Sequence, residues 1–179
     1  TGVFDFWKYQ ELLWDNRPDV VIEIGNYVGG STLALAHLMD NIDHGRLIGV
    51  DVNHSGVPDR VARHPRITLV EGEAAANLPR VQSLIEPGES VMIIEDSAHT
   101  YDNTLALLRT YGPLVTPGQY FIVEDTICWR GVDDGPEPPN AFEAVADFVA
   151  ENPVFEIDRD CEPFIVTWNP CGYLRRRPD

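Results

Sequence analysis

The sequence predicts an α/β fold with a mostly parallel central sheet. Short runs of apolar, often β-branched residues alternate with stretches of helical periodicity along most of the chain. Such alternation places helices on both faces of a parallel sheet. The chain has 179 residues, of which 44% are hydrophobic, which is enough for a sizeable core and excludes disorder as the main state. We therefore expect a single domain over residues 1–179.

The expected elements follow one another as this fold requires. Residues 4–14 have the apolar spacing of an amphipathic helix, which ends before Pro18. Each later apolar run is then expected to form a strand. The strands are residues 20–22, 47–50, 67–70, 91–94 and 120–123, and the helices between them are residues 32–39, 74–85 and 104–111.

The last third of the chain predicts a different local architecture. Residues 131–139 are rich in proline and glycine, as in a loop. Asn140 and Glu143 have the spacing of a capping box, which predicts a helix over residues 141–150. Residues 155–157 and 164–168 are expected to pair as an antiparallel hairpin that closes the sheet.

Charge and cysteine content exclude several classes of protein. The 13 basic and 29 acidic residues give a net charge of −16, which argues against nucleic acid or an anionic membrane as a partner. No run approaches the roughly 18 apolar residues of a membrane span. Cys128, Cys161 and Cys171 form no C-x-x-C pair, so we expect reduced thiols and a cytoplasmic protein. The sequence starts at Thr1, so we expect a trimmed N-terminus with room for a targeting segment upstream.

A glycine-rich turn, Glu-Ile-Gly-Asn-Tyr-Val-Gly-Gly-Ser, follows the first strand over residues 23–31. Such a turn lets backbone approach a ligand and points free helix N–H groups at it. Tyr27 stands where the dinucleotide pattern G-x-G-x-x-G needs its second glycine. Asp51 ends the second strand, where an acid can accept both hydroxyls of a ribose. A nucleoside ligand is favoured, and tight helix packing is the other interpretation of the turn.

Acidic residues also end the fourth and fifth strands. Asp96 follows the fourth strand, and Glu124 and Asp125 follow the fifth. In neighbouring strands these carboxylates would share a small volume, and their repulsion would favour a hard cation such as Mg²⁺. Taken singly, each acid could instead cap a turn or pair with a base. His99, three residues after Asp96, is placed to act as a general base beside such a site.

These motifs resemble those of class I S-adenosylmethionine-dependent methyltransferases. More narrowly, the chain is similar to the cephalosporin hydroxylase-like and rhamnosyl O-methyltransferase family, and the matching stretches span nearly the whole chain in order. The resemblance implies a Rossmann-like methyltransferase sandwich. The chain departs from the family in one respect, because we expect the usual extra N-terminal segment, which helps to cover the pocket, to be missing. The matching stretches are residues 7–12, 21–32, 96–99, 111–115, 118–126 and 169–174.

The resemblance also implies a role for each motif residue. Asp51 would hold the ribose, and Glu73 and Ala74 would flank the adenine. His99 occupies the place of the basic residue that follows the first acid in catechol-type O-methyltransferases, as a histidine does in macrolide-sugar methyltransferases. The methionine end of the cofactor would meet Glu23, Gly25, Asn26, Gly29, Gly30 and Ser31, and Mg²⁺ would bind Asp96, Glu124 and Asp125.

The implied reaction is methyl transfer, dependent on S-adenosylmethionine and Mg²⁺, to a hydroxyl of a sugar or hydroxylated natural product. Asp96 and His99 would be catalytic, with His99 removing the proton. A metal chelated by two adjacent oxygens favours a vicinal diol. Iron-dependent hydroxylation would need a second histidine at a strand end, and the sequence has none there.

Two alternatives stay open at this point. One is a nucleotide-binding Rossmann enzyme of another class, such as an NAD-linked one, against which Tyr27 argues. The other is a non-catalytic accessory protein of a β-lactam hydroxylation or methoxylation system, against which the intact acids and His99 argue. The expected partner is a small hydroxylated acceptor, and the sequence is also compatible with a homo-oligomer.

Overall fold

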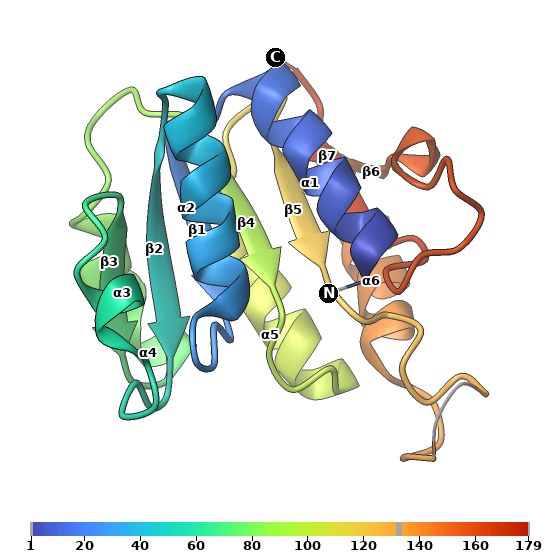
Figure 1. The fold of residues 1–179 in the computed structure, drawn as a ribbon. Coiled ribbons are helices and arrows are strands. Elements are labelled where there is room, and N and C mark those ends of the chain that lie inside the picture. Colours follow the sequence, from blue (N-terminus) through green and yellow to red (C-terminus); the bar gives the residue numbers. More distant parts are fainter. Residues whose placement is uncertain (1, 132–133, 179) are drawn as a thin grey trace.

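A seven-stranded sheet runs through the centre of the molecule (Figure 1). The structure, a computed structural model, describes residues 2–131 and 134–178. The strand order is β3-β2-β1-β4-β5-β7-β6; the first five strands are parallel, and β7 is antiparallel to both of its neighbours. The predicted fold class is confirmed. The strands are β1 (Val20–Ile24), β2 (Arg46–Asp51), β3 (Ile67–Glu71), β4 (Val91–Glu95), β5 (Tyr120–Val123), β6 (Phe155–Ile157) and β7 (Tyr173–Arg176).

Helices cover both faces of this sheet (Figure 1). One face packs against α1, α2 and α3, and the other against α4, α5 and α6. The short helix α3 and the 3₁₀ turns η1 and η2 were not predicted, because elements of three or four residues show no periodicity. The helices are α1 (Val3–Asn16), α2 (Gly30–Ile42), α3 (Asp59–Ala62), α4 (Ala74–Gln82), α5 (Tyr101–Tyr111) and α6 (Ala141–Glu151), with η1 (Gly112–Leu114) and η2 (Arg159–Cys161).

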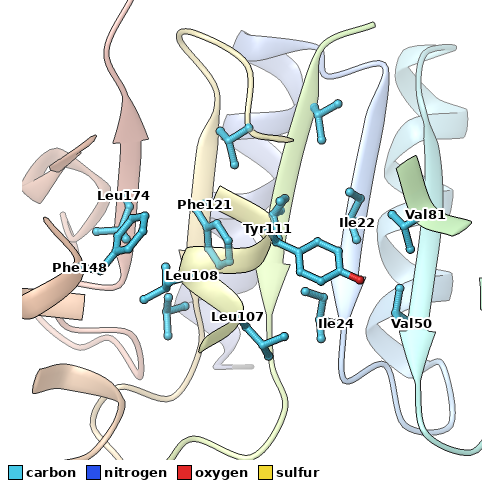
Figure 2. Packing of buried hydrophobic residues seen from close by; sticks show 14 of the residues in the cluster. Ile22, Ile24, Val50, Val81, Leu107, Leu108, Tyr111, Phe121, Phe148 and Leu174 are labelled. Atoms are coloured by element: carbon cyan, nitrogen blue, oxygen red, sulfur yellow. The ribbon is translucent and has the colours of Figure 1, made fainter. Parts of the chain in front are cut away.

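The sheet separates two buried apolar layers, which explains its uninterrupted apolar strands. Ile22 and Ile24 of β1 point into the layer beneath α4 and α5, while Val21 points into the layer beneath α1 and α2. Successive strand side chains alternate between the two faces, so most positions of a strand buried on both sides are apolar. Glu23 of β1 and Glu95 of β4 are buried exceptions near the carboxyl ends of these strands. In the layer beneath α4 and α5, the Tyr111 ring reaches from α5 across the sheet (Figure 2). Its hydroxyl donates a hydrogen bond of 2.7 Å to the Ala74 carbonyl.

The closing antiparallel pair differs from the predicted one. The strand at residues 155–157 forms as β6, but it pairs with β7, and residues 164–168 form no strand. Ile165 is 95% exposed and has a left-handed backbone, with φ of 68°. Thr167 Oγ1 and the Trp168 N–H donate instead to the Asp5 carboxylate of α1. The prediction was wrong because these polar contacts with α1 replace sheet pairing.

The N-terminus of α6 follows the sequence prediction. Asn140 Oδ1 accepts a hydrogen bond from the Phe142 N–H, and Glu143 accepts one from the Asn140 N–H, which confirms the capping box. Of the predicted loop before it, residues 132 and 133 lie outside the described residues. All three cysteines are free. Within the described parts of the chain, no helix combines the length and apolar character needed to cross a membrane.

The order of the strands fixes the place where a ligand can enter. The chain builds β1, β2 and β3 outward in one direction and then crosses back to place β4 on the other side of β1. Connections therefore leave the carboxyl ends of β1 and β4 in opposite directions, which opens a crevice there. At this point Gly25 has φ of 85°, and a Cβ on it would lie 2.2 Å from the Asp96 carbonyl oxygen. Only glycine allows the turn after β1 to lie against the end of β4.

Candidate functional site

A cavity of about 560 Å³ lies at the diverging ends of β1 and β4. Its volume is within the usual range for a small-molecule site. The glycine-rich turn and the start of α2 form part of its wall, the beginning of α1 forms another part, and Asp96 contributes a carboxylate. The residues that line it are Gly2, Val3, Phe6, Gly25, Asn26, Tyr27, Val28, Gly30, Ser31, Ala34 and Asp96. The contribution of α1 was not predicted, because its helical pattern shows which residues are apolar and not what they face.

Glu23 holds the start of α2 from inside the fold. Its side chain is buried and accepts hydrogen bonds from Thr32 Oγ1 and from Ser31. It is absent from the described lining of the cavity, so it supports the predicted cofactor-binding turn through Ser31 and Thr32. Burial raises the pKa of Glu23 to about 7, although the two hydrogen bonds oppose this shift.

The raised pKa of Glu23 predicts a pH-dependent stability. A carboxyl group whose pKa is about 7 when folded and 4.5 when unfolded stabilises the fold below pH 4.5, and this contribution is lost as the pH rises through 7. Glu23→Gln cannot ionise, so the variant escapes that loss. We expect the free energy of unfolding, measured with urea, to fall more steeply with pH in the parent than in the variant. From pH 5.5 to pH 8.5 the difference between the two proteins should change by about 2 kcal/mol in favour of the variant. Parallel pH profiles of the two proteins would contradict this expectation.

A second set of contacts fixes the glycine-rich turn from the side of β2. Asp51 Oδ2 accepts a hydrogen bond of 2.7 Å from the Tyr27 N–H. Asn26 Oδ1 lies 2.9 Å from Nε2 of His54. Nothing in the sequence assigned His54 to the site, because it belongs to no motif. Asn26 Nδ2, by contrast, is buried and has no hydrogen-bond partner among the residues that the structure describes. An unpaired amide donor in a cavity wall is a group that a bound ligand can satisfy.

Five of the predicted cofactor residues are not among the described residues that line the cavity: Glu23, Gly29, Asp51, Glu73 and Ala74. Gly29 has φ of 76°, and a Cβ on it would lie 2.7 Å from Val61 Cγ1 of α3. Glycine is therefore needed here for the left-handed backbone and for the close packing against α3. Glu73 is the exposed N-cap of α4, and Ala74 is partly buried against the core beside Tyr111. Their predicted positions beside an adenine remain predictions.

The ends of β4 and β5 bring three chemically active side chains together. Asp96, His99 and Asp125 each offer an atom within 4.8 Å of the other two. His99 Nε2 lies 3.9 Å from Asp96 Oδ1 and 3.7 Å from Asp125 Oδ2. Asp125 Oδ1 is buried, and none of the described residues forms a hydrogen bond with it. Burial, followed by the charge of Glu124, raises the pKa of Asp96 to about 8. A bound cation would oppose both causes, because it favours the ionised form of a buried carboxyl and offsets the charge of its acidic neighbours.

Glu124 lies next to this group but is not a member of it. Its side chain is buried, and the Tyr9 hydroxyl of α1 is hydrogen-bonded to it. Its charge nevertheless acts on Asp96, whose pKa it helps to raise. The structure thus brings Asp96 and Asp125 together with His99, while the role of Glu124 as a metal ligand remains a prediction.

Comparison with known proteins identifies the family. A family model described as rhamnosyl O-methyltransferase/CmcI matches residues 2–177. The chain belongs to this family. It is an S-adenosylmethionine-dependent O-methyltransferase. Membership decides against the alternative of a dinucleotide-dependent enzyme of another class.

Relatives and solved structures agree with this assignment. The chain is 33% identical to a rhamnosyl O-methyltransferase of Mycobacterium bovis over 183 residues, which covers 98% of this chain and 74% of the relative. Its fold matches a CmcI structure with Mg and SAM at a TM-score of 0.75 and 24% identity, over 98% of this chain and 72% of that one. The O-methyltransferase TomG from Streptomyces achromogenes, in complex with SAM, has a TM-score of 0.61 and 22% identity, over 83% and 66% of the two chains.

Proposed function

We propose that this methyltransferase uses Mg²⁺ to methylate a hydroxyl of a sugar or hydroxylated natural product, with His99 as the general base. The observation that carries the proposal is the double position of Asp96. Asp96 lines the cavity beside the glycine-rich turn and also belongs to the group formed with His99 and Asp125. A methyl donor in the cavity and a hydroxyl beside His99 would therefore meet at one carboxylate.

The residues of the cavity fit S-adenosylmethionine, which supplies an electrophilic methyl group when bound. Asn26 offers an unpaired buried amide donor, and Ser31 lies at the start of α2, where free N–H groups favour a carboxylate. Asp51 lies beside the turn, and a carboxylate has lone pairs left for a ribose after binding the Tyr27 N–H. Glu23, Gly25, Gly29, Gly30, Glu73 and Ala74 complete the proposed set of cofactor residues.

Two adjacent glycines test the position of the cofactor. A Cβ on Gly30 would meet no atom within 4 Å, and the residue lines the cavity. Gly30→Leu should therefore keep the fold but place its side chain in the cavity and lower S-adenosylmethionine affinity at least about tenfold, the effect of about 1.4 kcal/mol. Gly29→Val, with left-handed backbone and a contact with Val61, should instead lose about 2–5 kcal/mol of stability.

Calorimetric titration and urea unfolding of both variants would measure these effects. Gly30→Ala is the matched control, because a methyl group occupies little of the cavity. Full cofactor affinity in a folded Gly30→Leu protein would contradict the proposed position of S-adenosylmethionine.

The acidic group fits Mg²⁺ by the chemistry of its donors. Asp96 and Asp125 offer carboxylate oxygens, of which Asp125 Oδ1 is buried and unpaired, and Glu124 is the third predicted ligand. A bound Mg²⁺ would supply positive charge that favours an ionised hydroxyl. His99 Nε2 faces both carboxylates, which stabilise the imidazolium that forms when it accepts a proton. These residues would thus hold the acceptor and receive its proton.

A labelled-methyl transfer assay tests the reaction and the class of acceptor. Because the M. bovis relative is named a rhamnosyl O-methyltransferase, a rhamnoside is the natural first acceptor. A vicinal diol offers two oxygens to one metal, so we expect Mg²⁺-dependent transfer to a methyl rhamnoside and at least about tenfold slower transfer to its monodeoxy analogues. Equal rates with diol and monodeoxy acceptors would contradict the chelation of a diol.

The remaining parts of the proposal rest on composition. We place the activity in a single domain over residues 1–179 of a cytoplasmic protein, acting alone or as a homo-oligomer. The net charge of −16 supports a small neutral acceptor rather than nucleic acid or an anionic membrane.

A further inference from the structure

Residues 167–172 connect the loop that carries Asp125 to the rest of the fold. We call them the 167–172 segment; they precede β7 and form no helix or strand. The backbone of the segment accepts hydrogen bonds from Val123 N–H, Thr126 Oγ1 and Ile127 N–H, at 2.8, 2.7 and 3.1 Å. The end of β5 and the first residues of the loop after it are therefore held by a segment more than 40 residues later in the chain.

Asn169 makes the one side-chain contact of this segment with Asp125 that the described residues show. Asn169 is completely buried, and its Oδ1 accepts the Asp125 N–H at 2.8 Å. Its Nδ2 donates to the Tyr9 hydroxyl at 3.1 Å, and that hydroxyl is in turn bonded to Glu124. Both ends of the amide are thus used, which fixes the orientation of the side chain.

The backbone of Asp125 explains why such a contact is needed. Asp125 has φ of 56°, a left-handed conformation that L-residues other than glycine rarely adopt. Such a conformation persists only where the surrounding structure imposes it. This conformation directs the Asp125 carboxylate toward His99, 3.7 Å from Nε2, rather than along the path of a continued strand.

We propose that Asn169 is a positioning residue that holds Asp125 in its left-handed conformation and so keeps its carboxylate in the group with Asp96 and His99. The inference rests on the proposed function, in which that group binds Mg²⁺. Tyr9 has a supporting role, because its hydroxyl orients the Asn169 amide. Residues that orient a metal ligand through a hydrogen bond typically change metal affinity about 10–100-fold when they are removed.

Direct metal binding tests this role without relying on activity. The probe is Mn²⁺, whose binding is followed by electron paramagnetic resonance of the free ion. Asn169→Ala should weaken Mn²⁺ binding about 10–100-fold, and Tyr9→Phe, which leaves the Asn169 side chain intact, should weaken it less. S-adenosylmethionine affinity measured without metal should not change. If Asn169→Ala does not fold, Asn169→Leu, which keeps a side chain of similar size and lacks the acceptor for the Asp125 N–H, takes its place.

A matched control separates positioning from general destabilisation. Thr116 Oγ1 accepts the Val91 N–H at 2.9 Å at the opposite end of the sheet, so Thr116→Val also removes a side-chain acceptor from a strand backbone. It should lower stability and leave Mn²⁺ affinity unchanged. If Asn169→Ala and Tyr9→Phe lose stability in the same way and bind Mn²⁺ like the parent, Asn169 has only a structural role.

A double variant tests whether Asn169 acts through Asp125. In the Asp125→Asn background the carboxylate is already lost, so Asn169→Ala should cause little further loss of Mn²⁺ affinity. Fully additive losses would overturn the inference. A parent protein that binds no Mn²⁺, or one whose affinity Asp125→Asn does not change, would instead refute the metal site of the proposed function.

Discussion

Replacing Asp125 by asparagine is expected to lower methyl transfer about 10²–10³-fold, because a ligand of the proposed Mg²⁺ site loses its charge. Asparagine has nearly the same shape as aspartate and tolerates the left-handed backbone found here, with φ of 56°. Asp125→Asn should therefore fold as the parent does, whereas Asp125→Ala would confuse loss of the carboxylate with strain. The cavity that binds S-adenosylmethionine does not include Asp125 among its described lining, so cofactor affinity should be retained.

Rates measured with excess Mg²⁺, and again with excess chelator, provide the test. The chelator should reduce the parent to the level of Asp125→Asn and should have little further effect on the variant. Asp59→Asn is a suitable control, since Asp59 is an exposed acid paired with Arg63 on α3. Full activity of the parent in excess chelator would remove Mg²⁺ from the mechanism.

His99→Ala is expected to lower the rate of methyl transfer about 10²–10⁴-fold, the usual contribution of a general base. His99 lies close to both carboxylates, at 3.9 and 3.7 Å, and therefore could itself be a metal ligand. The two roles differ in their effect on metal binding. A base can be removed with Mn²⁺ affinity and S-adenosylmethionine affinity unchanged, whereas removing a ligand weakens Mn²⁺ binding along with the rate.

The rate should also recover in part as the pH rises, because hydroxide and an ionised acceptor hydroxyl replace the missing base. His37→Ala, at an exposed position on α2, should behave as the parent. A fall in Mn²⁺ affinity that parallels the fall in rate would assign His99 to the metal and overturn its role as base.

Much of the fold could be predicted from local sequence. The strands from residue 20 to residue 123 contain short apolar runs, because most positions of a strand covered on both faces are buried in the core. Asn140 and Glu143 predicted the start of α6, because a capping box needs only residues three positions apart. Residues 164–168 are also apolar, but most of them are exposed, and apolar character alone could not show that Asp5 holds this segment to α1.

The candidate site was predictable where it depends on strand ends and unpredictable where it depends on distant contacts. Asp96 and Asp125 could be placed together because parallel strands end at the same edge of a sheet. The hydrogen bond between Glu124 and the Tyr9 hydroxyl of α1 joins residues far apart in the sequence. The cavity wall supplied by Phe6, and the contact between Asn169 and Asp125, likewise join residues that no local pattern relates.

The position of β7 has a consequence for how the protein is made. Although β7 is the last strand in the sequence, it lies inside the sheet between β5 and β6. When the ribosome has released the chain only as far as residue 170, β5 and β6 have already been made. The strand that lies between them, β7, has not. Pairings between distant parts of a chain form slowly, and unpaired strand edges are prone to aggregation. The pairing of β5 with β7, and with it the anchoring of the loop that carries Asp125, therefore follows the synthesis of Arg176.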